Sequence, residues 1–472
     1  MIKQLTLAML AAGVLGGCSL APQYVRPEAP VASAYPTQAG EHAGDASVIG
    51  WREFFPDQRL QALITAALDN NRDLRIAALR IEEARALYNV QSADLWPNLN
   101  AAASGTRART PASLSATGSP VVGSSYQVGL SLASFELDFF GRVRSLNNAA
   151  LAQYLATEEA ARSARISLVA EVAKAYLNER ALAEQVDLAR KTMESRDTAY
   201  KLAKQRFDVG ASSALDLRQN EILVQSARAS LATLTRQRAQ ATNALTLLVG
   251  KAPGELPAET TLAEQNIVTD IPAGLPSGLL ARRPDIRAAE QRLIAANANI
   301  GAARAAFFPR ISLTAGVGTA SRELSGLFDS GSQTWSFAPQ LVLPLFDAGR
   351  NSANLSLANV RKNEAVADYE KSIQVAFREV ADALAARATL DDLIDAQSAV
   401  TAAQADRLKL ADQRYQNGVA SSLDVLDAQR ELFSAQQTLI QARLLKLTNA
   451  IDLYRSLGGG LQESSAPAAT AK

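Results

Sequence analysis

The chain has 472 residues and carries 48 Lys and Arg against 47 Asp and Glu, so its net charge is close to zero. This balance excludes a strongly basic nucleic-acid-binding protein and an acidic disordered tail. The composition is rich in alanine, leucine and charged residues, which is typical of long helices. Cysteine and histidine each occur once, as Cys18 and His42, so we expect no intrachain disulfide, metal cluster or histidine-based catalytic triad.

The N-terminus has the pattern of a secretory signal. Lys3 precedes an apolar run over 5–14 that is too short to span a bilayer. The sequence Leu-Gly-Gly-Cys that ends at Cys18 has the pattern of a bacterial lipobox, in which the cysteine thiol accepts a diacylglycerol. We expect cleavage before Cys18, and Ser19 behind it is typical of lipoproteins sent to the outer membrane. An ordinary signal peptide with an incidental cysteine is the alternative.

The chain contains an internal duplication, in which residues 60–250 match 273–458. The stretch RFDVGASSALDL at 206–217 recurs as RYQNGVASSLDV at 414–425. Three glycines recur 208 residues later in regions that lack proline: Gly141, Gly210 and Gly250 correspond to Gly349, Gly418 and Gly458.

Each half begins with a helix, expected over 58–95 and 284–306, that ends before a proline. Two strand-like segments follow, and the alternation of apolar and polar residues is clearest over 334–345. A long helix free of glycine and proline comes next. In the first half it covers 142–208, which is about 100 Å at the ~1.5 Å rise per residue of an α-helix.

The long helix reverses direction once in each half. Gly210 and Gly418 fit a left-handed turn after a helix C-terminus, and Asp216 and Asp424 fall in the first turn of the returning helix. The returning helix of the first half, at 212–249, is only about 57 Å long. We therefore expect two shorter helices to stack against each long one: 284–306 with 212–249, and 58–95 with 419–457.

The fold class expected from these patterns is mainly α with a small β part. Four strands in one chain cannot close on themselves in lipid, since open sheet edges leave backbone groups unpaired. The strands are therefore either soluble or pooled by several chains. Aromatic residues cluster at the helix–strand junctions and form either an interfacial belt or ordinary core: Trp96, Phe139, Phe140, Phe307, Phe308 and Phe346.

Several motifs add to these features: RRPDIRAAE, AAFFPRISL, SGLFD, ELDFFGR and LDAQR. Together they resemble the TolC-like outer membrane factors of tripartite RND drug efflux pumps, in their lipoprotein branch, over essentially the whole chain. The resemblance implies a homotrimer with a twelve-strand transmembrane β-barrel and a periplasmic tunnel of long antiparallel helices. It implies a periplasmic adaptor and an inner-membrane RND transporter as partners. It also implies N-palmitoyl and S-diacylglycerol groups on Cys18, no other cofactor, and no enzymatic activity.

The resemblance assigns the hairpin tips to the closed periplasmic entrance. It makes Tyr415, Asp424 and Asp427 gate residues, with like charges repeated around a narrow axis. Asp216 is the corresponding helix-start carboxylate of the first tip. The alternative is that Asp216 and Asp424 only begin their helices. Some relatives carry an arginine just after the tip glycine, and this chain has Ala420 there.

Three other functions stay open at this point. A lipid-anchored periplasmic coiled-coil protein explains the helices but not the strand pairs. A channel for metal ions or for type I secretion is a variant of the same architecture.

The expected domains are the signal peptide 1–17, an extended segment 18–57, repeat one 58–250 with hairpin 98–138 and tip 208–211, a connector 251–283, repeat two 284–458 with hairpin 310–346 and tip 416–420, and a flexible tail 459–472.

Overall fold

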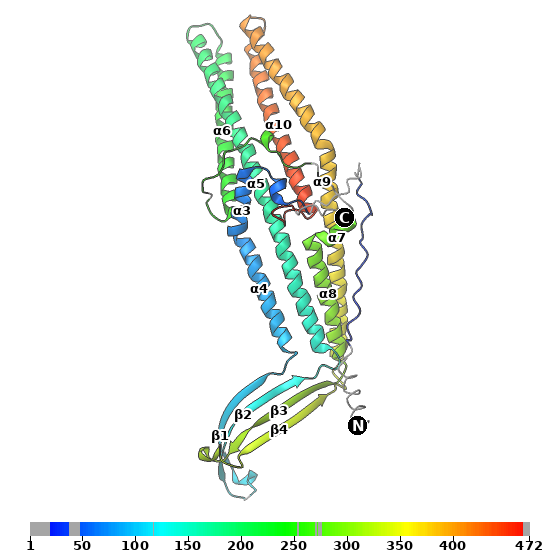
Figure 1. The fold of residues 1–472 in the computed structure, drawn as a ribbon. Helices are drawn as coiled ribbons and strands as arrows, with labels where there is room; N and C mark the ends of the chain where they lie inside the picture. The colour runs from blue at the N-terminus through cyan, green and yellow to red at the C-terminus, as the bar shows by residue number, and fades with distance from the viewer. Residues whose placement is uncertain are drawn as a thin grey trace. The chain divides into compact units, whose positions relative to one another are not determined.

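The computed structural model describes residues 19–36, 48–116, 118–252, 254–269, 271 and 276–465. It divides into two compact units. The first contains the described residues of Met1–Glu28, Arg80–Glu158 and Ala288–Tyr369. The second contains those of Ala29–Leu79, Glu159–Arg287 and Glu370–Lys472. The expected fold class is confirmed, because long helices dominate and four strands form one sheet (Figure 1).

The first unit holds the sheet, whose antiparallel order β1-β2-β3-β4 follows the chain. The register pairs Leu99 with Leu132, and Arg310 with Val342. All ten residues of β4 are exposed. Both faces of this edge strand therefore lack a partner in the single chain. The strands and their connecting turns are β1 (Leu99–Thr110), η2 (Ala112–Leu114), β2 (Val121–Glu136), β3 (Arg310–Ser321), η4 (Leu324–Gly326) and β4 (Gln333–Val342).

Small side chains let two helices of the first unit pack closely. Ala149 and Ala152 of α5 (Arg142–Asp208) contact Ala295 and Ala298 of α8 (Pro284–Ala305). The N-terminal segment lies along α8, where Arg26 forms a two-pronged ion pair of 2.7 and 2.9 Å with Glu290. This contact ties the segment that follows the predicted lipid site to a helix of the first unit.

The second unit contains the tips of both helical hairpins, with α5 from Glu159 onward and α9 from Glu370 onward. Its remaining elements are α2 (Trp51–Phe54), α3 (Gln58–Asn70), the start of α4 (Arg72–Ala93), α6 (Ala214–Val249), η3 (Leu262–Glu264), α7 (Pro276–Arg282), most of α9 (Arg350–Gln416) and α10 (Ser422–Ser456). The core contains Phe54, which stacks on Tyr454 with 3.9 Å between ring centroids. Among the described residues, the helices lack an apolar stretch long enough to cross a membrane.

Two details of the predicted helices are wrong. The expected helix 58–95 is broken at Asn71, whose side-chain oxygen accepts a hydrogen bond from the Leu74 amide and so begins α4. The same side chain donates to the Leu248 carbonyl at 2.8 Å, so α4 begins at the end of α6. The helix lengths alone would allow α4 to stack on either α6 or α10. The contacts of Asn71 show that it stacks on α6, which belongs to the same repeat.

The second repeat forms the same joint. Arg283, immediately before α8, donates to the Ser456 carbonyl at the end of α10, at 3.1 Å. The shorter helices therefore meet within one repeat rather than between repeats. In the C-terminal segment, the Gln462 carbonyl accepts a hydrogen bond from the Trp51 amide. Residues 466–472 lie outside the described residues.

Candidate functional site

The first hairpin reverses through a turn that closes on the end of α5. Gly210 has a φ of +78°. Its amide donates to the Phe207 carbonyl at 2.9 Å, and the Ala211 amide donates to Arg206 at 2.7 Å. This pair of hydrogen bonds is the Schellman motif, which satisfies carbonyls that the helix end leaves free. A residue with a Cβ pays about 1–2 kcal/mol for this conformation.

The second tip repeats the same geometry. Gly418 has a φ of +74° and donates to the Tyr415 carbonyl at 3.0 Å, while the Val419 amide donates to Arg414 at 2.9 Å. An added Cβ would meet nothing within 4 Å at either Gly210 or Gly418. The left-handed backbone, rather than crowding, therefore explains why each turn uses glycine.

Both returning helices begin with a capping box. The Asp216 amide donates to the Ser213 hydroxyl, and the Asp216 carboxylate accepts from the Ser213 amide, at 3.1 and 3.4 Å. Asp424 and Ser421 form the same pair at 3.4 and 3.0 Å. Each carboxylate thus satisfies backbone donors at a helix N-terminus. These contacts fit the alternative in which Asp216 and Asp424 only begin their helices. A gate role for Asp424 stays a prediction.

Two side-chain contacts join the tips of the two hairpins. Arg206 of α5 donates to the Tyr415 hydroxyl of α9 at 2.8 Å, and its guanidinium lies 5.9 Å from the centre of that ring. Ser422 of α10 donates to Asp216 of α6 at 2.7 Å. We call these four residues the tip latch. Since its members come from both hairpins, separating the tips must break both contacts.

The Asp216 carboxylate is stabilised in its charged form. Hydrogen bonds from Ser213, and then from Ser422, lower the pKa of Asp216 below its ordinary value. The contact with Ser213 lies within one hairpin, whereas the contact with Ser422 depends on the second hairpin. Ionisation of Asp216 therefore favours the latched arrangement through Ser422.

Asp427 lies between two arginines rather than alone on an acidic surface. Its Oδ2 lies 2.6 Å from Arg407, and its other oxygen contacts Arg430. The hydrogen bond from Arg407, together with the charge of Arg430, lowers the pKa of Asp427. The positions equivalent to these three in the first repeat are Ala199, Gln219 and Ile222. We expected Asp427 to add negative charge to an acidic constriction. Within one chain, this charge is offset by the neighbouring arginines.

Farther from the tips, an apolar cluster joins α10 to the first hairpin. Phe433 of α10 packs against a buried cluster of Val186 and Ala189 of α5 and Leu234 of α6, and Leu231 of α6 packs against the same cluster. This group, which we call the inter-hairpin cluster, holds the hairpins together through apolar burial. The hairpins of one chain thus have an apolar attachment near mid-length and a polar one at the tips.

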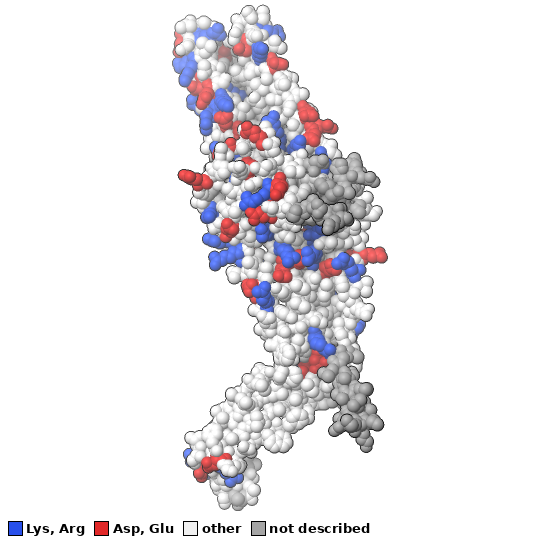
Figure 2. Space-filling model, in the orientation of Figure 1, with Lys and Arg blue, Asp and Glu red and all other residues white. Residues whose placement is uncertain are grey.

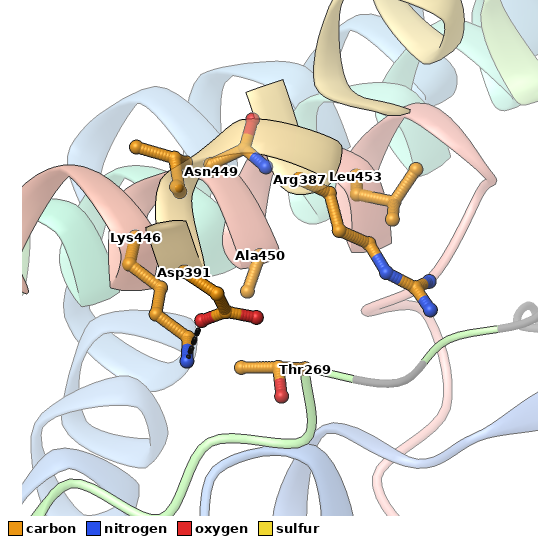
Figure 3. A pocket seen from close by; sticks show the side chains of 8 residues that line it. Thr269, Arg387, Asp391, Lys446, Asn449, Ala450 and Leu453 are labelled. Atoms are coloured by element: carbon orange, nitrogen blue, oxygen red, sulfur yellow. Dashed lines mark ion pairs between the residues drawn. The ribbon is translucent and has the colours of Figure 1, made fainter. Parts of the chain in front are cut away.

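A separate cavity of about 410 Å³ lies between α9, α10 and the connector (Figure 3). Lys446 and Asp391 form an ion pair across it, and Thr269 reaches it from the connector. Arg387, also on its wall, donates to the Ile271 carbonyl at 2.9 Å. The polar groups of this cavity fasten the connector to the helices.

Two of the four latch residues, Arg206 and Ser422, have no role that the sequence alone predicts. Arg206 is repeated as Arg414, but its partner Tyr415 depends on how the hairpins meet. Ser422 replaces Ala214 of the first repeat, and this difference between copies was an available signal. Cys18 and His42 lie outside the described residues. Within the described ranges, the side chains form no group of metal-ligand type.

Comparison with known proteins identifies the family. The family model described as outer membrane efflux protein matches residues 63–251 and 275–459, which are the two repeats. The chain belongs to the outer membrane efflux protein family. The chain is 51% identical to the outer membrane protein OprJ of Pseudomonas aeruginosa over 466 residues, covering 97% of this chain and 96% of that protein. It is also 51% identical to the toluene efflux pump outer membrane protein TtgI of Pseudomonas putida, covering 97% and 99%.

Solved structures agree with this assignment. The chain is similar to a membrane protein from Pseudomonas aeruginosa with a TM-score of 0.87 at 51% identity, covering 94% of this chain and 98% of that one. It is similar to the open state of the Neisseria gonorrhoeae MtrE outer membrane channel with a TM-score of 0.87 at 44% identity, covering 95% and 100%. The family predicted from the motifs is therefore confirmed. Membership assigns the chain to efflux and places it in the outer membrane of a Gram-negative bacterium.

Proposed function

We propose that this chain is the exit duct of a tripartite RND-type efflux system. It conducts drugs and other small molecules passively from the periplasmic assembly to the outside and performs no catalysis. The family match supports this proposal, as do relatives named for the efflux of toluene, solvents and antibiotics. A periplasmic adaptor and an inner-membrane RND transporter are the proposed partners.

The proposed assembly is a homotrimer in which three copies pool their strands into one closed sheet. Two features of the sheet support it. The edge strands β1 and β4 each have a strand partner on one side only, and unpaired edges are not tolerated in lipid. The visible face of the sheet carries almost no charged side chains over most of its length (Figure 2). Such a surface suits contact with acyl chains.

The proposed gate is the pair of hairpin tips, and the tip latch is the observation that carries it. Arg206, Asp216, Tyr415 and Ser422 hold the hairpins of one chain together through one exposed and one partly buried hydrogen bond. Such contacts are weak enough to break and reform when a partner docks. Asp424 sets the start of α10 beside the latch. Asp427 helps to hold α9 and α10 together as one moving unit.

The proposed anchor is a lipid on Cys18, with N-palmitoyl and S-diacylglycerol groups. The ordered segment that follows it supports this proposal. Arg304 near the end of α8 donates to the Leu20 carbonyl at 3.1 Å, and Asn297 donates to the Pro22 carbonyl at 2.7 Å. Leu20 therefore lies beside the last turn of α8, which ends at Ala305, shortly before β3 begins at Arg310. An acyl chain two residues earlier would then lie near the strands.

Complementation tests the proposal in cells. The chain, expressed with its adaptor and transporter in a strain that lacks an outer-membrane efflux channel, should restore resistance to exported compounds. Outer-membrane fractions should contain a crosslinkable trimer that dissociates on heating. A monomer in the periplasmic fraction, or a trimer without restored resistance in the presence of both partners, would contradict the proposal.

A further inference from the structure

Within the described part of the chain, Arg196 of α5 is a buried cation without a counter-ion. The residue is 5% exposed. Its Nη1 donates one long hydrogen bond of 3.4 Å to the Leu223 carbonyl of α6, and its Nε has no hydrogen-bond partner. Among the described residues it makes no ion pair. A buried charge normally needs a carboxylate and a full set of hydrogen bonds to offset its lost hydration.

The second hairpin covers this cation. The Arg196 guanidinium lies 5.7 Å from the ring centre of Phe433 on α10. Burial, and then the positive charge of Arg430 on the same helix, lower the pKa of Arg196. Arg430 is itself held by Asp427 and contacts Glu431 at 3.5 Å. The acidic groups nearest to Arg430 are thus engaged with arginines of the second hairpin.

Arg196 lies between the two attachments that join the hairpins. Seven residues toward mid-length, Ala189 belongs to the inter-hairpin cluster, and ten residues toward the tip, Arg206 belongs to the tip latch. At ~1.5 Å per residue these intervals are roughly 10 and 15 Å. The cation therefore lies at the tip side of the inter-hairpin cluster, against its α10 member Phe433, and it becomes exposed when parting of the tips also moves Phe433 away from α5.

The duplicated hairpin shows that this charge is not needed for the fold. The equivalent residue of the second repeat is Gln404, which is neutral and half-buried. Both hairpins nonetheless form long helices of the same length with the same turn. The first hairpin therefore carries a charge at a position where its copy does without one.

We propose that Arg196 is a built-in opening element: its unpaired charge is buried only while the hairpins are together, so it favours their separation. This inference rests on the proposed gating at the tips and adds a force that opposes the latch. When α10 moves away, water reaches the guanidinium and the proximity of Arg430 is relieved. The attraction between Arg196 and the Phe433 ring opposes this, but at 5.7 Å it acts near the outer limit of about 6 Å. The lost hydration therefore dominates.

Pulsed electron spin resonance tests the inference on the full-length protein in membranes. Spin labels at Val209→Cys and Val419→Cys report the separation of the tips, since these residues are 78% and 66% exposed. Labelled copies are diluted with an excess of unlabelled copies, so that distances arise within one chain. A Tyr415→Phe background weakens the latch and populates the separated state. Adding Arg196→Gln should then shift the ratio of separated to latched tips at least fivefold toward latched.

Two further variants make the result specific. Arg196→Met keeps the apolar stem and should shift the ratio in the same direction. Arg190→Gln removes an exposed cation from the same helix and should leave the ratio unchanged. An unchanged or increased separated fraction in both Arg196 variants would overturn the inference. If the distances shift while bilayer conductance does not, Arg196 opposes the latch as inferred and the proposed gate is wrong instead.

Discussion

Ser422 of the second hairpin donates a hydrogen bond of 2.7 Å to the Asp216 carboxylate of the first. Asp216 also caps its own helix through Ser213, so one side chain both begins α6 and binds the neighbouring hairpin. The first repeat has Ala214 where the second has Ser422. The two tips therefore share one geometry. The Ser422 hydroxyl makes the second tip a hydrogen-bond donor to the first.

Loss of that hydroxyl should loosen the tips. A hydrogen bond to a charged group contributes about 1.5–3 kcal/mol when sheltered, and less at this partly buried position. We expect Ser422→Ala to speed amide hydrogen exchange severalfold at the start of α6 and of α10. Ser434→Ala, at an exposed position on α10, is the matched control and should change neither. Equal exchange in the two variants would show that the Ser422 hydroxyl does not stabilise the tips.

The latch should weaken in acid. The pKa of Asp216 is lowered, first by Ser213 and then by Ser422, and only the second contact is lost when the tips part. Its stabilisation is therefore present above the ordinary carboxyl value of 3.8 and is lost as the pH falls through the lowered value. Channel opening in bilayers should rise as the pH falls below about 4.

Asp216→Asn provides the control for this titration. The amide cannot ionise, so the part of the acid response that arises at Asp216 should disappear in the variant. Asp427, whose pKa is also lowered by Arg407, titrates in the same direction and remains as a background. If the wild type and Asp216→Asn respond identically to acid, the response arises at Asp427 or at another group.

The tip glycines should be needed for backbone reasons alone. Gly210→Ala and Gly418→Ala place a Cβ in open space but in a left-handed conformation. Each should destabilise its hairpin by about 1–2 kcal/mol, seen as a lower midpoint of thermal unfolding and faster local exchange. Gly254→Ala also meets open space but lacks a positive φ, and it should be neutral. Three equal effects would remove the conformational explanation.

Asp57, which binds two residues of the connector, should be a sensitive carboxylate. It accepts hydrogen bonds from Tyr176, Thr260 and Gln265 at 2.8, 2.7 and 2.7 Å, and it caps α3. Burial raises the pKa of Asp57, but these donors outweigh it and lower the value overall. Asp57→Ala leaves the donors unpaired and should cost about 3 kcal/mol of stability. Asp69→Ala, exposed on the same helix, should cost little; a similar loss there would refute this role.

The proposed anchor is tested by chemistry at one atom. Cys18→Ser removes the chain's only thiol. Incorporation of radiolabelled palmitate should fall to background, while a Ser19→Ala control should remain labelled. Palmitate that persists in Cys18→Ser would reject Cys18 as the acceptor.

The elements that depend on local rules could be predicted from the sequence. The bounds of α5 at 142–208 follow from the absence of Gly and Pro and from the Schellman turn at Gly210. Contacts between distant segments could not be predicted. The joint of α4 with α6 depends on where the Asn71 side chain points, because helix lengths fit both pairings.

The same limit applied to the site. Tyr415 was expected at the tips from a family resemblance, but its partner Arg206 comes from the packing of two hairpins. Asp427 read as part of an acidic constriction, since Arg407 is 20 residues away in the chain and faces it only once α9 and α10 pair. The unpaired charge of Arg196 is likewise a property of packing and has no local sequence pattern.

Single-channel conductance in planar bilayers shows whether the hairpin tips close the duct. The protein is compared with a variant that carries both Tyr415→Phe and Ser422→Ala, which removes the hydrogen bonds to Arg206 and Asp216 without removing a charge. We expect a trimeric channel of low conductance in the wild type and a severalfold higher conductance in the variant. Equal conductance in two preparations that both insert as trimers would contradict the claim that the hairpin tips close this duct.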